Sequence, residues 1–250
     1  MERKYMIISI LIILILALTG YIIYRIIDLE WRYDIGKNEV YYKGWSGSSG
    51  YFNRLVEGAD PDSFEVLKSK FYGKDKNLVF FRGDKIPGAD ASSFVSVGDF
   101  YAKDKRRGYY NGSPIESSHG TDFRIIDNDY STDGIDIFYG SIPLNVRSAK
   151  DFKFIYPIPL WATDGFFYYF KNYRIPSDDY QNVQVFEGTN GVAKDKSWIY
   201  YQDRRINYNL KGEKLFDVDV ASFTYHDPFI DGGQDKDGCI DAKEGRVKCN

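Results

Sequence analysis

Residues 72–81 of the chain read YGKDKNLVFF, and related stretches recur along most of the sequence. Residues 101–110 read YAKDKRRGYY, and residues 193–201 read AKDKSWIYY. An aspartate returns roughly every 30 residues, and three mostly apolar residues begin four positions after it. These repeated aspartates are Asp75, Asp104, Asp133, Asp164 and Asp195. This regular spacing indicates a repeat protein.

A second block accompanies the first. An aliphatic residue is followed eight positions later by phenylalanine, with glycine, aspartate and serine enriched between them. The copies run over residues 56–64, 86–94, 115–123 and 215–223. Aspartate and serine side chains bond readily to nearby backbone N–H groups, so we expect this block to form the loop that joins two repeats.

The apolar trio predicts a β-strand. Residues such as Val79, Phe80 and Phe81 fit a pleated surface, and the polar residues 74–77 before them favour a tight turn. The pattern therefore predicts a β-hairpin in each repeat, with residues 64–72 as its first strand. Alternation along the strand places Val79 and Phe81 on one face and Phe80 on the other, so the packing of Phe80 and of its counterpart Tyr200 is an open question.

The predicted fold class is all-β. A single hairpin cannot bury its own apolar face, so tandem antiparallel β-hairpin repeats of about 30 residues must pack on one another. Two arrangements fit this requirement, an elongated array or a propeller-like ring. The repeated aspartates are expected to bond to backbone N–H groups at the turns, which we favour over a role in acid–base catalysis.

These motifs resemble the DKNYY repeat family of bacterial proteins. The resemblance rests on Asp75, Lys76 and Asn77 followed by residues 79–81, and on Asp195 and Lys196 followed by residues 199–201. It covers roughly residues 33–250. The resemblance implies a bacterial protein that is usually exported, and it implies no catalytic residue.

The N-terminal segment predicts a membrane anchor. Residues 5–24 contain no charged side chain and consist mostly of isoleucine and leucine, which suits a hydrocarbon core of about 30 Å. We expect a cytoplasmic tail at residues 1–4, a transmembrane helix at residues 5–27 and the repeat domain at residues 28–250, on the periplasmic or extracellular side. A cleaved signal peptide is the alternative, but its apolar core is usually shorter.

The C-terminal end offers two further candidates. Cys239 and Cys249 can close a small loop with a disulfide in an oxidising compartment. The surrounding segment also resembles part of a calcium-binding loop. Its candidate ligands are Asp235, Asp237, Asp241 and Glu244. The alternative, which we favour, is a shortened final repeat that needs no cofactor.

Composition narrows the possible functions. The chain has 250 residues, 22 Tyr, 18 Phe, and 33 Lys+Arg against 36 Asp+Glu, so a basic nucleic-acid binder is not expected. Repeats offer a broad surface on which tyrosine provides contact area. The sequence therefore predicts an anchored binding module of the cell envelope, with an envelope protein or a glycan as partner. The alternative is an envelope hydrolase with its site on a loop, which predicts a pocket with converging titratable groups.

Overall fold

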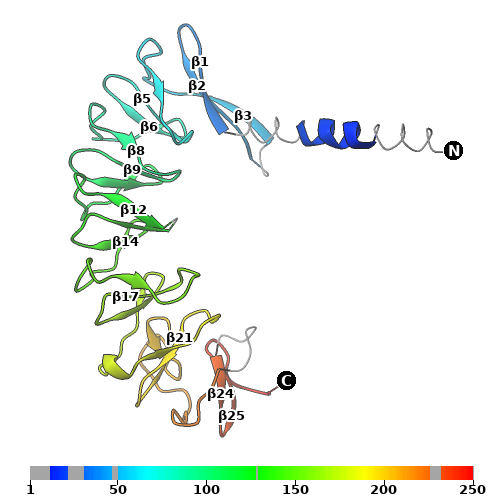
Figure 1. Cartoon of the computed structure of the whole chain (residues 1–250), viewed down its shortest axis with the longest axis vertical. Coiled ribbons are helices and arrows are strands. Elements are labelled where there is room, and N and C mark those ends of the chain that lie inside the picture. The colour runs from blue at the N-terminus through cyan, green and yellow to red at the C-terminus, as the bar shows by residue number, and fades with distance from the viewer. Residues whose placement is uncertain (1–11, 22–30, 47–49, 128, 226–231, 250) are drawn as a thin grey trace, which may run out of the picture. The chain divides into compact units, whose positions relative to one another are not determined.

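The computed structural model describes residues 12–21, 31–46, 50–127, 129–225 and 232–249. These residues confirm the all-β expectation, because they form seven small antiparallel sheets that succeed one another along the chain (Figure 1). Two compact units contain them, Met1–Pro114 and Ile115–Asn250. Each unit is described by itself below.

The first unit contains three sheets. Its first sheet is β1 (Trp31–Ile35), β2 (Val40–Ser46) and β3 (Gly50–Leu55). The second is β4 (Glu65–Val66), β5 (Tyr72–Lys74), β6 (Val79–Phe81) and β7 (Asp84–Lys85). The third is β8 (Val95–Ser96), β9 (Tyr101–Lys103), β10 (Gly108–Tyr110) and β11 (Ser113–Pro114).

The second unit contains four sheets. They begin with β12 (Arg124–Asp127), β13 (Tyr130–Thr132), β14 (Ile137–Tyr139) and β15 (Ile142–Pro143). The next is β16 (Lys153–Phe154), β17 (Trp161–Thr163), β18 (Tyr168–Phe170) and β19 (Tyr173–Arg174). The 3₁₀ helix η1 (Tyr180–Asn182) leads to β20 (Gln184–Val185), β21 (Val192–Lys194), β22 (Ile199–Tyr201) and β23 (Arg204–Arg205). The last sheet is β24 (Gly232–Asp235), β25 (Gly238–Asp241) and β26 (Gly245–Val247).

The typical repeat is a four-stranded meander, which corrects the expected two-stranded hairpin. The stretch expected as one strand over residues 64–72 is divided between β4 and β5. The chain reverses between them, because the N–H of Tyr72 bonds to the carbonyl of Ser69 and the N–H of Leu67 bonds to the carbonyl of Tyr72. After the trio, the chain turns back again into a two-residue edge strand.

Both faces of the central hairpin in the second sheet are buried. Tyr72 and Val79 pack towards Tyr109 of the following sheet, whereas Phe80 packs towards Tyr42 of the preceding one. The open question about Phe80 and Tyr200 is thereby answered: neither side chain exposes any surface, so both are packing residues. Phe80 and Tyr200 point to the opposite face of the strand from the other two members of their trios, and they pack against the preceding sheet.

A small residue stands across from the middle of each trio and makes this packing possible. Six cross-strand pairs in successive sheets join a glycine, alanine or serine to a larger residue. These pairs are Gly73 with Phe80, Ala102 with Tyr109, Ser131 with Phe138, Ala162 with Tyr169, Ala193 with Tyr200, and Gly233 with Ile240. At Gly73 a Cβ atom would lie 2.5 Å from Cζ of Phe64, so the loop phenylalanine occupies the space that a side chain would need.

The expected anchor lies largely outside the described residues. Of residues 5–27, residues 12–21 are described, and they form an exposed apolar helix. Within the described part of the chain, no helix has the length and apolar character needed to cross a membrane.

Candidate functional site

The repeated aspartates stabilise the turns and tie each turn to the loop before it. Oδ1 of Asp75 accepts hydrogen bonds from the backbone N–H groups of Asn77 and Leu78, and both bonds are 2.7 Å long. Its Oδ2 accepts a 3.0 Å bond from the N–H of Asp60 in the preceding loop. Asp104, Asp133, Asp164 and Asp195 make the same turn contacts. The five aspartates lie in separate turns, so they do not converge on one site.

Three of these aspartates also accept a bond from a buried tyrosine. The hydroxyls of Tyr109, Tyr169 and Tyr200 lie 2.7, 3.0 and 2.5 Å from Oδ2 of the aspartate five residues before them. Burial raises the pKa of Asp195, but the bonds from Ser177, Tyr200 and two backbone N–H groups outweigh it and leave the pKa below its usual value. The carboxylate is thus held charged by groups that belong to the fold.

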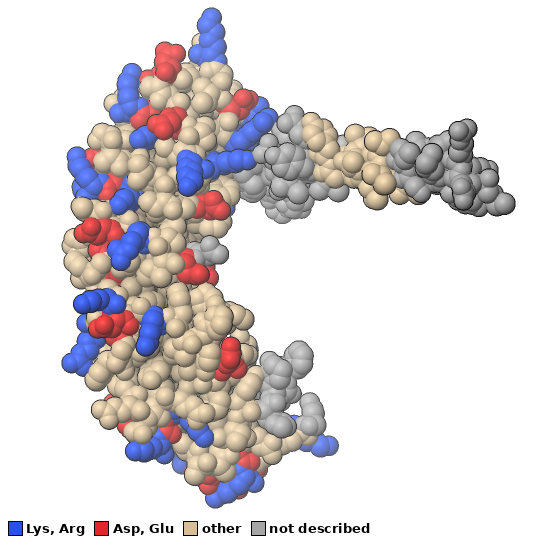
Figure 2. Space-filling model, in the orientation of Figure 1, with Lys and Arg blue, Asp and Glu red and all other residues tan. Residues whose placement is uncertain are grey.

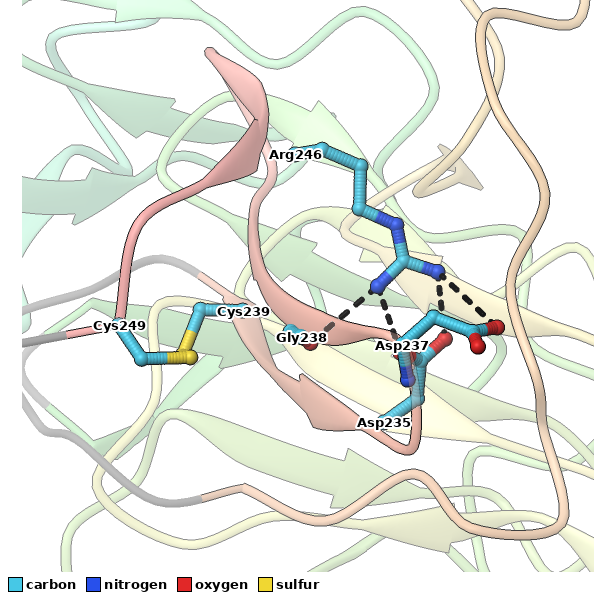
Figure 3. The surroundings of a disulfide bond; sticks show 6 residues. All are labelled: Asp235, Asp237, Gly238, Cys239, Arg246 and Cys249. Carbon is cyan, nitrogen blue, oxygen red and sulfur yellow. Dashed lines mark hydrogen bonds and ion pairs between the residues drawn. A yellow bond between two sulfur atoms is a disulfide. The ribbon is translucent and has the colours of Figure 1, made fainter.

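Three of the four carboxylates considered for calcium make other contacts. Oδ1 and Oδ2 of Asp235 lie 2.5 and 2.7 Å from the Arg246 guanidinium (Figure 3). Oδ2 also accepts a 2.8 Å hydrogen bond from the N–H of Asp219. Asp237 lies 4.0 Å from Arg246. Asp241 caps the N–H groups of Lys243 and Glu244. In the described ranges, no three His, Cys, Asp or Glu side chains gather where they could hold a metal ion.

The structure joins Cys239 to Cys249 by a disulfide (Figure 3). Ile240 and Ala242 face the preceding sheet, where they pack with Ile199 and Tyr201. Because side chains alternate along a strand, Cys239 lies on the opposite, outer face of β25. The disulfide therefore covers the face on which a further sheet would stack.

Two repeats of the second unit carry a partly buried aromatic residue that packs against the core at the end of the turn. Phe167 and Trp198 each lie three residues after the repeated aspartate, where the other repeats have Leu78, Arg107, Asp136 and Gly238. An arginine of the adjacent edge strand stacks on each ring. Cζ of Arg174 lies 4.6 Å from the centre of Phe167, and Cζ of Arg205 lies 3.6 Å from that of Trp198.

A tyrosine from the next loop completes each group. The ring centres of Phe167 and Tyr180 are 4.7 Å apart, and those of Trp198 and Tyr208 are 6.1 Å apart; both pairs meet edge to face. We call these two groups the Arg–aromatic–Tyr triads. Their members are Arg174, Phe167 and Tyr180 in the first, and Arg205, Trp198 and Tyr208 in the second.

Each triad adjoins a surface pocket. The first pocket has a volume of about 350 Å³, and its lining includes Phe166, Tyr168, Asp178 and Tyr180. The second has a volume of about 460 Å³, and its lining includes Asp203, Arg205, Tyr208 and Asn209. Phe166 keeps 43% of its surface exposed, and the guanidinium of Arg147 lies 4.3 Å from its ring centre.

The polar atoms of the triads are available to a ligand. Among the residues that the structure describes, the guanidinium groups of Arg174 and Arg205 make no hydrogen bond or ion pair, and the hydroxyls of Tyr180 and Tyr208 make no hydrogen bond. Burial raises the pKa of Tyr180, so its hydroxyl stays protonated and can donate. Each triad thus carries unused hydrogen-bonding groups beside a surface pocket.

Sequence reasoning did not find the triads. The signal that could have found them was the departure of Phe167, Arg174, Trp198 and Arg205 from the residues that other repeats have at the same positions. Elsewhere on the visible surface, acidic and basic side chains are interspersed and do not form a patch of one sign (Figure 2).

Comparison with known proteins gives one match. The model of the DKNYY family matches residues 33–166, which is more than half of the chain and confirms the resemblance read from the motifs. Neither the curated proteins nor the solved structures contain a match to the chain. Both triads have members beyond the matched segment, so their role must be argued from their own geometry.

Proposed function

Because the chain belongs to the DKNYY family, we propose that its stacked repeats form a scaffold for binding a partner in the bacterial cell envelope. The observation that carries this proposal is an Arg–aromatic–Tyr triad in each of two successive repeats, with the aromatic residue and the arginine at equivalent positions. Arginine and aromatic residues are the types that most often dominate binding energy at interfaces.

The repeats themselves serve as internal controls for this argument. The repeat around Asp75 folds with Leu78 and Lys85 where the triad repeats have an aromatic residue and an arginine. Leu78 packs partly buried against the core, as Phe167 and Trp198 do, so the position serves packing but does not require an aromatic ring with an arginine beside it. What distinguishes the two triad repeats is the arginine and tyrosine added around this packing position, beside a surface pocket, and this addition supports contact with a ligand.

We place the binding surface outside the cytoplasm, with residues 5–27 as the membrane anchor and the N-terminus in the cytoplasm. Two observations support this placement. Residues 5–24 carry no charge, and the disulfide between Cys239 and Cys249 is of a kind that persists in oxidising compartments. The partner is an envelope protein or glycan and not a nucleic acid, since the net charge of the chain is -3.

For the arrangement of the repeats, we favour an open array over a propeller-like ring. The outer face of β25 carries a disulfide and Asp241, where earlier sheets have aliphatic or aromatic residues for the next sheet to cover. Such a face suits the end of a stack, because a ring would need it to pack against another sheet.

The aspartates of the repeat turns do not favour the hydrolase alternative. The buried aspartates with a lowered pKa are Asp104, Asp133, Asp195 and Asp235. Each is held by hydrogen bonds in its own repeat turn. A hydrolytic site would need such groups to converge beside a pocket.

The proposal is tested by chemical crosslinking and pull-down of the full-length protein from its native membrane. A variant with Phe167→Leu and Trp198→Leu is compared with the unchanged chain. We expect at least one partner to be enriched in the pull-down with the unchanged chain and not with the variant. Equal recovery of every partner by both chains would contradict the proposal.

A further inference from the structure

The chemistry of the triads narrows the class of ligand. Each triad adds an arginine with unused N–H donors and a tyrosine hydroxyl that is free to donate or accept, and aromatic rings line both pockets, Phe166 and Tyr180 at the first and Tyr208 at the second. Carboxylate oxygens lie at the same pockets, from Asp178 and Asp179 at the first and from Asp203 at the second. We infer that the two triads form paired subsites for a linear, uncharged glycan, an inference that rests on the proposed function.

A sugar ring matches this combination of groups. One side of a pyranose ring presents C–H groups that can pack on the face of Phe166 or Tyr208, while its hydroxyls both donate and accept hydrogen bonds. The aspartates that line both pockets can accept hydrogen bonds, while the Tyr180 hydroxyl at the first pocket and Arg204 and Arg205 at the second can donate. An apolar ligand would leave these polar groups desolvated and unpaired.

The charges at the pockets argue against a charged polymer. Arg174 faces Tyr180 at the first subsite, whose pocket is lined by Asp178 and Asp179. At the second subsite, Arg204 and Arg205 share a pocket with Asp203. A polyanion or an acidic peptide would meet these carboxylates, and a polycation would meet the arginines, so like-charge contacts disfavour both.

The repetition of the triad points to a chain of sugars. The sheets that carry the triads are neighbours, because Trp161 and Phe170 of one pack against Ala193 and Tyr200 of the next. Sheets packed face to face are roughly 10 Å apart, so equivalent residues of the two triads repeat on that scale. A linear glycan can occupy both subsites at once, and two linked contacts bind far more tightly than one.

The test uses the full-length protein in detergent and an array of uncharged linear oligosaccharides of glucose and of N-acetylglucosamine, graded in length from the single sugar upwards. We expect binding to at least one series, with affinity that rises steeply once the chain is long enough to reach both subsites. The double variant Phe167→Leu, Trp198→Leu should weaken binding at least roughly tenfold, and each single variant should remove the dependence on length.

Two controls keep the test decisive. Arg174→Lys with Arg205→Lys leaves both rings in place and should also weaken binding, while Ile135→Asn changes an exposed residue at the turn of another repeat and should not. Thermal melting verifies that each variant is folded.

Absence of binding to every oligosaccharide, or binding that survives both double variants, would overturn the inference. If the pull-down then still enriched a protein partner through the triads, the proposed function would stand without the glycan.

Discussion

The hydroxyl of Tyr200 donates a 2.5 Å hydrogen bond to Oδ2 of Asp195, inside the turn that begins the central hairpin's second strand. The same oxygen accepts a 2.6 Å bond from the hydroxyl of Ser177 in the preceding loop. One carboxylate therefore connects a turn, a strand and a loop. This contact shows why an aspartate recurs in every complete repeat.

Replacing Asp195 by alanine should destabilise the protein strongly. Two backbone N–H groups and two hydroxyls would lose their acceptor in a buried place, which costs roughly 3–5 kcal/mol in the free energy of unfolding. Tyr200→Phe is the matched control and should cost about 1 kcal/mol, since Phe80 and Phe138 occupy the same position in other repeats. Urea denaturation measures both, and equal losses would contradict the assigned role of the carboxylate.

The free energy of unfolding should decrease at acidic pH. Hydrogen bonds hold the pKa values of Asp104, Asp133, Asp195 and Asp235 below the usual value of 3.8, despite burial, which raises them. A carboxyl whose pKa is lower in the folded state stabilises the protein above its unfolded pKa, and this contribution is lost as the pH falls through the folded pKa. Melting temperatures should therefore change little between about pH 7 and 5 and drop below about pH 4. A constant melting temperature down to pH 3 would argue against this.

Adding one carbon at Gly73 should disturb the contact between two sheets. The new Cβ of Gly73→Ala would lie 2.5 Å from Cζ of Phe64, and relief of that overlap should cost about 1–3 kcal/mol in unfolding free energy. Phe64→Leu by itself should also destabilise, but the double variant should be more stable than the sum of the two losses implies. A strictly additive result in thermal or urea unfolding would mean that the two residues do not compete for space.

Reduction of the disulfide should loosen the last sheet in preference to the others. Cys239 and Cys249 are separated by ten residues, and closing so short a loop stabilises by about 2–3 kcal/mol. In a stack of repeats, each sheet depends mainly on its neighbours. Hydrogen exchange after reduction should accelerate at residues 238–247 and stay unchanged at residues 72–81. Uniform acceleration along the chain would contradict this local effect.

The repeat period and the all-β fold could be predicted because the chain repeats its chemistry. The aspartate of each turn and the apolar trio are local patterns, and local patterns can be read from sequence. The four-stranded form of the repeat could not be predicted, since strands of two residues such as β4 and β7 are too short to show any alternation.

Two copies of the loop block were missed for a related reason. The spacing from Leu144 to Phe152 and from Ile175 to Val183 matches the other copies, but the residues between have drifted. The backbone preserves them, because the N–H of Leu144 bonds to the carbonyl of Ile137, as the N–H of Ile86 bonds to that of Val79. The backbone contact thus recurs even in repeats where the sequence motif has changed.

The triads escaped prediction because each draws its members from a turn, an edge strand and a later loop. Phe167 and Tyr180 lie thirteen residues apart and meet only after the chain has folded back. In a chain with 22 Tyr and 18 Phe, the aromatic residues of the triads do not stand out from the others. Comparison of equivalent positions between repeats is what singles out Phe167 and Trp198.

Site-specific photocrosslinking in the native membrane tests the central claim most directly, which is that the triad surface contacts a partner. A photoreactive residue replaces Phe166, which lies beside the first triad, or Asn77, which is exposed at the same turn position in the first unit. The account predicts a crosslinked adduct from position 166 that disappears when Phe167→Leu and Trp198→Leu are added, and none from position 77. Adducts of equal yield from both positions, or an adduct from position 77 alone, would contradict it.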